Sequence, residues 1–270
     1  MGYKQLIINP GSTSTKLALY DGTEKVVQEN IEHDAAQLHQ FESIAEQVPF
    51  RLQIIRDFMA RSSIRDTELS AVMGRGGLVF GLKTGGYEVN DDLCQALVSD
   101  KLSQAHASNL GGLLAREVAR PLGIPAYIYD AVTGGELSDV AKITGIPDIE
   151  RRSFCHVLNS HAIAIRYAQE NGLDYNKLNL IVAHLGGGIS ASVHAHGQII
   201  DSVGDDDGQF SPERSGCVPS LELIRLCYSG EYTKAEMMKK VRGKGGLFAL
   251  LGTSDCRVIE KSIQDGDRHA

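Results

Sequence analysis

The chain has 270 residues, with 27 basic and 34 acidic side chains, a formal net charge of −7 at neutral pH and 42% hydrophobic residues. This composition is typical of a soluble globular protein of one or two domains, and it excludes a disordered chain. The acidic balance argues against a nucleic-acid partner, since phosphate backbones are bound by clustered Lys and Arg, and no apolar run approaches the ~18 residues of a membrane span.

The first half of the chain alternates short apolar runs with turns and helical patterns. Strands are expected at 5–8, 17–20 and 25–31. Apolar residues at helical spacing over 35–62 predict helix, and Pro49 within them predicts two helices rather than one. The next expected elements are a strand at 69–73, helices at 90–96 and 105–120, a strand at 126–129 and a helix at 155–171.

The opening pattern of strand, turn and strand returns 175 residues later. Expected strands at 180–183 and 189–194 enclose a glycine run, and the same offset aligns Gly22 with Gly197. Two such units with matched spacing indicate a duplicated domain, with chance similarity between two hairpins as the alternative. We therefore expect a first domain over 1–178 and a second over 179–270. A full second copy would run to about residue 350, so the second domain is expected to be incomplete.

The turns between these strand pairs are candidate phosphate-binding loops. Backbone N–H groups in such turns can surround an anion, and the hydroxyl of Ser12 adds a donor. The first turn is not a Walker A loop, because the stretch from Gly11 to Lys16 lacks a second glycine before the lysine and Leu17 stands where Ser or Thr is required. Taken singly, each turn is also consistent with a tight hairpin.

Two arginines and one aspartate have the chemistry that phosphoryl transfer requires. Arg75 and Arg214 both lie in glycine-containing loops, and a planar guanidinium can bind two phosphate oxygens. Asp130 follows the strand at 126–129, where α/β sheets place ligand groups. The alternatives are two solvated loop arginines and, at Asp130, a helix N-cap.

Several histidines are candidates as well. His184 adjoins the second glycine-rich turn, and His156 follows a pair of arginines, so both can act near a transferred phosphate. His194 and His196 alternate along an expected strand and so share a face, where a solvent-facing pair is favoured over a metal site. The acidic run 205–207 is expected to be a solvated loop, because no calcium-loop pattern completes it.

Six motifs, in order along nearly the whole chain, resemble those of the carboxylate kinases, the family of the acetate and butyrate kinases. They are Ile8-Asn9-Pro10-Gly11-Ser12-Thr13-Ser14-Thr15-Lys16, Gly74-Arg75-Gly76-Gly77, Tyr129-Asp130-Ala131-Val132, Arg151-Arg152 through His156, His184-Leu185-Gly186-Gly187-Gly188 and Pro212-Glu213-Arg214-Ser215-Gly216. The resemblance implies an α/β protein with the duplicated actin-like ATPase fold, which is ribonuclease H-like, with mixed sheets flanked by helices. This fold agrees with the internal repeat.

The resemblance also implies how the nucleotide and metal are held. Asn9, Gly11 and Ser12 would form a first loop for the nucleotide phosphates. A second loop would consist of Gly186, Gly187 and Gly188. Asn9 and Asp130 would hold Mg²⁺.

Catalytic roles are implied in the same way. Arg75 and Arg214 would clamp the substrate carboxylate and the transferred phosphoryl group. His184 would steady that group, and His156 would be a further active-site histidine. Asp130 would position the nucleophile.

The implied reaction is reversible phosphoryl transfer from ATP to a short-chain carboxylate, which converts butyrate and ATP to butyryl phosphate and ADP. Acetate, propionate or a branched-chain acid are alternative substrates. Family members continue beyond this sequence into a glycine-rich adenosine-binding segment and a glutamate that helps to hold Mg²⁺, so an inactive remnant or a binding module is a second alternative. The resemblance also implies a homo-oligomer. A cytoplasmic location is expected, because the five cysteines are odd in number and lack C-x-x-C spacing.

Overall fold

The computed structural model describes residues 2–204 and 207–270. It contains two compact units, Met1–Gly135 and Glu136–Ala270. The domain boundary expected at 178/179 from the repeat stays a prediction. The compact units divide earlier, because helix α6 (Val157–Glu170) packs on a strand of the second unit. Asp205 and Asp206 of the acidic run lie outside the described residues.

The first unit is built on a six-stranded mixed sheet in the order β3-β2-β1-β4-β6-β5. Its strands are β1 (Lys4–Pro10), β2 (Ser14–Asp21), β3 (Glu24–Glu32), β4 (Leu69–Arg75), β5 (Gly86–Glu88) and β6 (Ala126–Tyr129). β1, β4 and β6 are parallel neighbours, whereas β2, β3 and β5 pair antiparallel. The sequence predicted every one of these strands except β5, which is too short to show a periodic pattern.

The helices of the first unit are α1 (Ala35–Leu38), α2 (Val48–Arg61), α3 (Asp91–Val98) and α4 (Leu110–Ala119). The predicted break at Pro49 is confirmed. Pro49 is the second residue of α2, where an intrahelical N–H bond is not needed. Asn90 caps α3 by accepting a 2.8 Å hydrogen bond from the N–H of Leu93.

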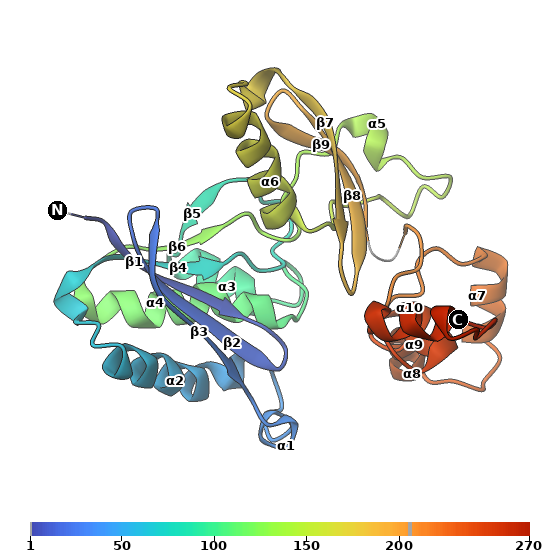
Figure 1. The fold of residues 1–270 in the computed structure, drawn as a ribbon, viewed down its shortest axis with the longest axis horizontal. Coiled ribbons are helices and arrows are strands. Elements are labelled where there is room, and N and C mark those ends of the chain that lie inside the picture. The colour runs from blue at the N-terminus through green and yellow to red at the C-terminus, as the bar shows by residue number, and fades with distance from the viewer. Residues whose placement is uncertain (1, 205–206) are drawn as a thin grey trace. The chain divides into compact units, whose positions relative to one another are not determined.

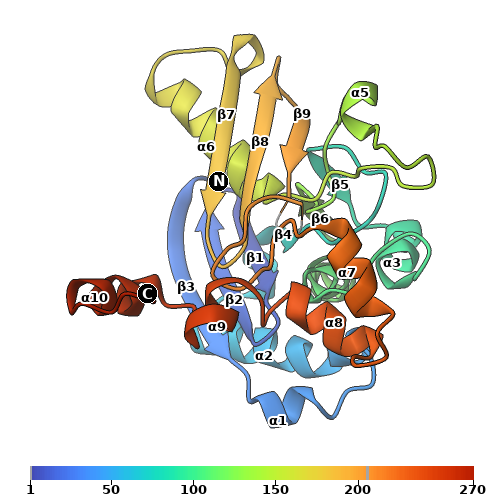
Figure 2. The same ribbon diagram turned by 90° about the vertical axis from the view of Figure 1, so that its right-hand side faces the viewer.

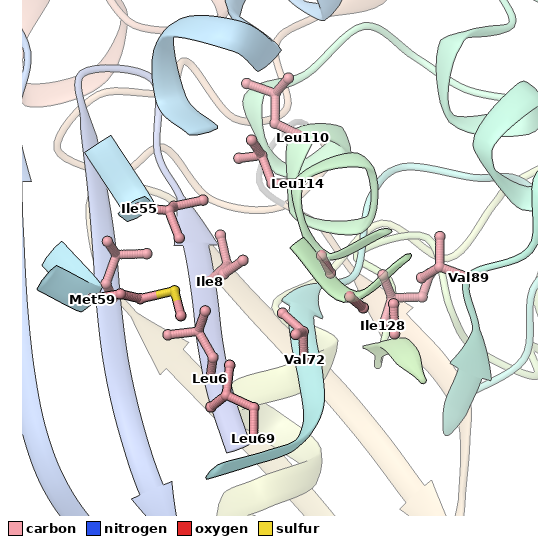
Figure 3. Packing of buried hydrophobic residues seen from close by; sticks show 14 of the residues in the cluster. Leu6, Ile8, Ile55, Met59, Leu69, Val72, Val89, Leu110, Leu114 and Ile128 are labelled. Atoms are coloured by element: carbon pink, nitrogen blue, oxygen red, sulfur yellow. The ribbon is translucent and has the colours of Figure 1, made fainter. Parts of the chain in front are cut away.

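The core of the first unit lies between its sheet and helices α2 and α4 (Figures 1 and 3). Fully buried apolar side chains fill it from both sides. The strands contribute Leu6, Ile8, Val72 and Ile128, and helices α2 and α4 contribute Ile55, Phe58, Leu110 and Leu114. Alternate residues of a strand face opposite sides of a sheet. Because Ile8 and Ile128 face the helices, Asn9 and Tyr129 face the other side.

The second unit has a three-stranded antiparallel sheet in the order β7-β8-β9, with α6 packed on β7 (Figure 2). The strands are β7 (Asn179–Leu185), β8 (Ile189–Ala195) and β9 (Gln198–Val203). Further helices are α5 (Asp139–Lys142), α7 (Ser220–Cys227), α8 (Lys234–Val241), α9 (Gly246–Leu251) and α10 (Cys256–Gln264). The sequence predicted β7, β8 and α6, and no prediction covered α5, β9 or the later helices.

The buried face of β8 is polar rather than apolar. Ser190, Ser192 and His194 on this strand are at most 2% exposed, whereas Ile181 and Leu185 on β7 are 79% and 78% exposed. The solvent-facing histidine pair was therefore a wrong expectation. His194 is fully buried against Tyr175, and His196 lies in the exposed turn that follows the strand.

The repeat is confirmed at the level of strands, with one refinement. β7 begins and ends 175 residues after β1. The turn between the paired residues Pro10 of β1 and Thr15 of β2 contains four residues, whereas the turn between Leu185 and Ile189 contains only three. After the loop, equivalent residues of the two copies are therefore 174 positions apart. With this offset, the register shift at Leu19/Tyr20 in the first copy coincides with the one at Val193/His194 in the second. Gly22, with φ 61°, thus matches His196, with φ 51°, and not Gly197.

None of the helices in the described ranges is both long and apolar enough to cross a membrane.

Candidate active site

Three candidate residues of the first unit lie at one edge of its sheet. The parallel register pairs Ile8 with Gly74 and Gly74 with Ile128, so Asn9, Arg75 and Tyr129 form the next row. Asp130 follows β6 directly. The carboxyl ends of parallel strands form the edge where α/β sheets bind ligands. The first unit therefore brings together Asn9, Arg75, Asp130 and the loop that begins at Gly11.

Arg75 is the last residue of β4 and is half-buried. Its guanidinium forms no hydrogen bond or ion pair with any residue in the described ranges, and burial lowers its pKa. This setting differs from a solvated loop arginine, and it leaves the planar fork available to an anion.

The glycines beside Arg75 serve packing. A Cβ at Gly74 would collide with the carbonyl of Gly111 in α4, and a Cβ at Gly76 would lie 2.6 Å from the Cα of Ala131. The backbone before Arg75 therefore sits against helix α4, and the backbone after it sits against the loop that follows β6. This close approach holds the end of β4 and so directs the arginine.

Asp130 has an unusual backbone conformation. Its φ is 45°, and its side chain is only 2% exposed. Its Oδ1 accepts a 2.8 Å hydrogen bond from the N–H of Gly85, and its own N–H donates to the Gly85 carbonyl. Asp130 is not a helix N-cap, because the next helix, α5, is capped by Ser138. A buried carboxylate held in a left-handed conformation is typical of a functional site.

The loop from Gly11 to Ser14 connects β1 to β2. The N–H of Gly11 donates to the carbonyl of Ser14 at 2.8 Å, which closes the turn. Ser12 is exposed at its tip. Arg51 of α2, which no sequence argument singled out, lies beneath this loop and is fully buried.

The second unit places its two candidate histidines in direct contact. His184 is the penultimate residue of β7, in the strand rather than in the turn, and His156 is the N-cap of α6. Their rings are stacked with centroids 3.7 Å apart and planes within 9°. Residues 28 positions apart in the sequence thus form one site.

Neighbouring polar side chains orient both rings. The Nδ2 amide of Asn159 donates to Nδ1 of His184 at 2.9 Å, and Nδ1 of His156 lies 2.8 Å from the hydroxyl oxygen of Ser190. With the Asn159 amide in this orientation, Nδ1 of His184 accepts, which favours a neutral ring with its proton on Nε2. Burial also lowers the pKa of His184. The ring is therefore a neutral Nε2–H donor at pH 7.

The glycine loop of the second unit is tied to the segment that carries Arg214. The carbonyl of Gly187 accepts hydrogen bonds from the hydroxyl of Ser211 at 2.7 Å and from the N–H of Glu213 at 3.1 Å. Arg214 is half-buried and lies 3.3 Å from the Glu213 carboxylate. Gly186, Gly187, Ser211 and Pro212 also line a cavity of about 390 Å³.

Asp130 and Asn9 fit a Mg²⁺ site in which most of the ligands would be substrate phosphate oxygens and water. No cluster of three or more His, Cys, Asp or Glu side chains within 2–204 and 207–270 could bind a metal ion by itself. Mg²⁺ in phosphoryl-transfer enzymes is bound through one or two carboxylates together with phosphate oxygens and water. Asp130 with Asn9 matches that donor set, whereas an all-protein site would need more carboxylates.

Sequence reasoning missed the residues that hold the predicted ones in place. Arg51, Asn159 and Ser190 lie outside any glycine-rich motif, and Arg51 is 40 positions from Gly11, whose carbonyl it binds. A charged residue on the apolar face of the predicted helix was the available signal for Arg51. Asn159 and Ser190 gave no signal, since single polar residues in a helix or strand are common.

Comparisons with known proteins identify close relatives. Residues 150–270 match the model of the acetokinase family. The probable butyrate kinase 2 of Caldanaerobacter subterraneus subsp. tengcongensis is 45% identical over 269 residues, which cover 99% of this chain and 76% of that protein. Butyrate kinase 1 of Clostridium acetobutylicum is 44% identical over 98% of this chain and 75% of that protein.

A solved structure agrees with this fold. The acetate kinase of Porphyromonas gingivalis superposes with a TM-score of 0.77 at 21% identity, over 99% of this chain and 74% of that one. The chain thus spans about three quarters of the length of the relatives it matches. The similarity at this identity supports the expected duplicated actin-like architecture.

Proposed function

The chain belongs to the acetokinase family, and from that premise we propose that it transfers the γ-phosphoryl group of ATP to the carboxylate of butyrate. The products are butyryl phosphate and ADP, and the reaction is reversible. A carboxylate oxygen forms the new bond to phosphorus while the bond from the γ-phosphorus to the bridging oxygen of ADP breaks. The observation that carries the proposal is the 44–45% identity to butyrate kinases over nearly the whole chain.

The chemistry requires electrostatic help rather than a general base. A carboxylate with a pKa near 4 is already ionised at neutral pH, so no group needs to remove a proton from it. The main barrier is the repulsion between two anions that must approach in line. Cationic and N–H donors are therefore the groups expected to carry out catalysis.

The first unit supplies such donors in our proposal. Arg75 binds an oxygen-bearing anion, the carboxylate or the transferred phosphoryl group, because its guanidinium is half-buried and unpaired in the described part of the chain. The loop of Gly11 and Ser12 binds nucleotide phosphate. Asp130 and Asn9 would hold Mg²⁺, which when bound neutralises charge on the phosphate oxygens.

The second unit supplies a neutral donor and a second loop. His184 donates from Nε2 to a phosphoryl oxygen without adding a full charge, and His156 supports its ring from one side. Gly186, Gly187 and Gly188 offer backbone donors to phosphate. Arg214 adds a guanidinium whose position depends on the Ser211–Gly187 hydrogen bond.

The choice of acid, the oligomeric state and the cellular location stay predictions. Butyrate is proposed over acetate, propionate or a branched-chain acid, and a methylene changes binding by only ~1–3 kcal/mol, so the choice needs measurement. Assembly into a homo-oligomer is proposed. A cytoplasmic location is proposed as well, supported by five cysteines that are all free.

The test is an assay of the 270-residue chain with ATP, Mg²⁺ and a carboxylate, in which hydroxylamine traps the acyl phosphate as a hydroxamate. We expect kcat/KM to be highest for butyrate among butyrate, propionate and acetate at matched concentrations. A higher value for acetate or propionate would overturn the assignment of butyrate. No hydroxamate with any of the acids would favour the alternative of a binding module.

A further inference from the structure

We propose that Arg51 is a positioning residue that shapes the first phosphate loop, and that a bound nucleotide phosphate supplies the counter-charge this buried cation lacks. The proposal rests on the proposed nucleotide role of the loop from Gly11 to Ser14. It adds a residue that lies in none of the recognisable motifs.

Arg51 holds the loop through its carbonyl oxygens. Its Nη2 donates to the carbonyls of Gly11 at 2.9 Å and Ser12 at 3.5 Å, and its Nη1 donates to the carbonyl of Ser14 at 2.8 Å. The side chain is fully buried. One guanidinium thus gathers three of the loop's carbonyl groups on one side, which its rigid fork can do and a single ammonium cannot.

This arrangement fixes the direction of the loop's N–H groups. A trans peptide is planar, so the carbonyl of one residue and the N–H of the next point in opposite directions. No cis peptide occurs in the described chain. With the carbonyls of Gly11 and Ser12 turned toward Arg51, the N–H groups of Ser12 and Thr13 point away from it, and neither has an acceptor among the described residues. Outward N–H groups of this kind bind anions.

Among the residues that the structure describes, no carboxylate pairs with the charge of Arg51. Its other contacts are neutral: Nε donates to Oε1 of Gln47 at 3.1 Å, and Nη1 donates to the hydroxyl of Thr15 at 2.9 Å. Arg51 forms no ion pair with a carboxylate of the described residues, and burial alone lowers its pKa to about 10. A buried cation without a counter-ion is costly, and an anion at the loop would relieve that cost.

His33 lies beside Arg51 and adds no second positive charge. Thr15 shares a 2.8 Å hydrogen bond with Nε2 of His33, which is 9% exposed. Burial, and then the charge of Arg51, lower the pKa of His33 and outweigh the opposite effect of the Glu32 carboxylate, so His33 adds no second cation at pH 7. The positive charge beneath the loop is therefore that of one guanidinium.

The variant Arg51→Lys tests the proposal, because it keeps the charge and loses the fork. The first readout is the rise in melting temperature that tripolyphosphate or ATP causes, which requires no turnover. We expect the rise in wild type and its loss in Arg51→Lys. The second readout is kinetic, and we expect KM for ATP to rise about tenfold or more while KM for butyrate is unchanged. A purely structural role would lower the melting temperature without changing either ligand effect.

Two further variants make the test decisive. Arg61→Lys is the matched control, since Arg61 is on the same helix but is exposed and pairs with Glu29, and it should behave as wild type. If Arg51→Lys does not fold, Gln47→Ala takes its place, because it removes a neutral tether of Arg51 without touching the loop. We expect it to weaken both ligand effects in the same direction.

The proposal is overturned if wild type shows no rise with tripolyphosphate or ATP. It is also overturned if the folded variant keeps the wild-type rise and the wild-type KM for ATP. A rise that is lost in the variant, with no acyl hydroxamate formed by wild type, would support Arg51 as a phosphate-loop residue and contradict the kinase activity. The two proposals therefore fail separately.

Discussion

The imidazole rings of His156 and His184 are stacked with their centroids 3.7 Å apart, and each ring has its own polar partner, Ser190 and Asn159. Two positive charges at this separation would repel each other strongly. This repulsion disfavours a state in which both rings are charged. In the orientation that the structure has, Nδ2 of Asn159 donates to Nδ1 of His184, which favours the neutral form of that ring.

This tautomer predicts the pH dependence of activity. Burial lowers the pKa of His184 from its ordinary 6.5, so the neutral ring persists below that pH and kcat/KM should fall only under more acidic conditions. In Asn159→Asp a carboxylate would accept from Nδ1–H and favour the charged ring, so the acidic limb should move up by about one unit or more. The pH profile of kcat/KM measures this.

The control for that experiment is Asn171→Asp, at the end of the same helix and away from both histidines. Its acidic limb should coincide with that of wild type. An unmoved limb in Asn159→Asp would contradict the role of Asn159.

Arg75→Ala should reduce turnover by about two to three orders of magnitude, because it removes the unpaired cation at the end of β4. The fold should survive, since the guanidinium has no partner in the described ranges. The hydroxamate assay and a thermal melt check the two parts. A variant with a wild-type rate would exclude Arg75 from the chemistry.

Gly74→Ala should destabilise the first unit by about 1–3 kcal/mol, because the new methyl group would collide with the carbonyl of Gly111 in α4. Gly145→Ala is the matched control, since nothing lies within 4 Å of a Cβ there, and its effect should be within about 0.5 kcal/mol. Urea unfolding measures both. Equal stabilities would show that β4 and α4 can separate without cost.

His194 predicts a loss of stability in acid. Its Nδ1 lies 2.7 Å from the hydroxyl of Tyr175 and its Nε2 lies 2.9 Å from that of Ser192. Burial, and then the charge of His161, lower its pKa from 6.5 to about 4. The unfolded chain thus binds the proton more tightly, and stability should fall as the pH drops from 6.5 toward 4, by up to about 3 kcal/mol.

The measurement is the free energy of unfolding in urea at pH 7 and pH 4.5, for wild type and for His194→Gln. The variant should have a smaller difference between the two pH values. A difference as large as that of wild type would assign the acid sensitivity to other groups.

Local patterns were sufficient for much of the fold. Apolar runs between turns gave β1 to β4, β6, β7 and β8, and Pro49 marked the start of α2. β5 was missed because it has only three residues, and no prediction covered the helices after residue 219, although α7 and α10 carry apolar residues at helical spacing.

The candidate active-site residues also divide into those that local motifs predicted and those that only the structure identified. Asn9, Arg75, Asp130, His156, His184 and Arg214 came from local motifs and a family resemblance. Their supporting residues came from the structure alone, because Arg51 reaches Gly11 across 40 positions and Ser190 reaches His156 across 34. The local sequence around a residue gives no sign of a hydrogen bond to a residue so far away along the chain.

The sequence by itself determined the strand–turn–strand repeat, the glycine-rich loops and the residue types of the predicted phosphoryl-transfer site, because these depend on short-range backbone and side-chain chemistry. Tertiary structure decided the rest. Strand register makes the second loop one residue shorter than the first. Tertiary contacts bury His194 in a polar layer and place the Arg51 guanidinium under the loop from Gly11 to Ser14. These features arise from strand register and from contacts between distant segments, which exist only once the chain has folded.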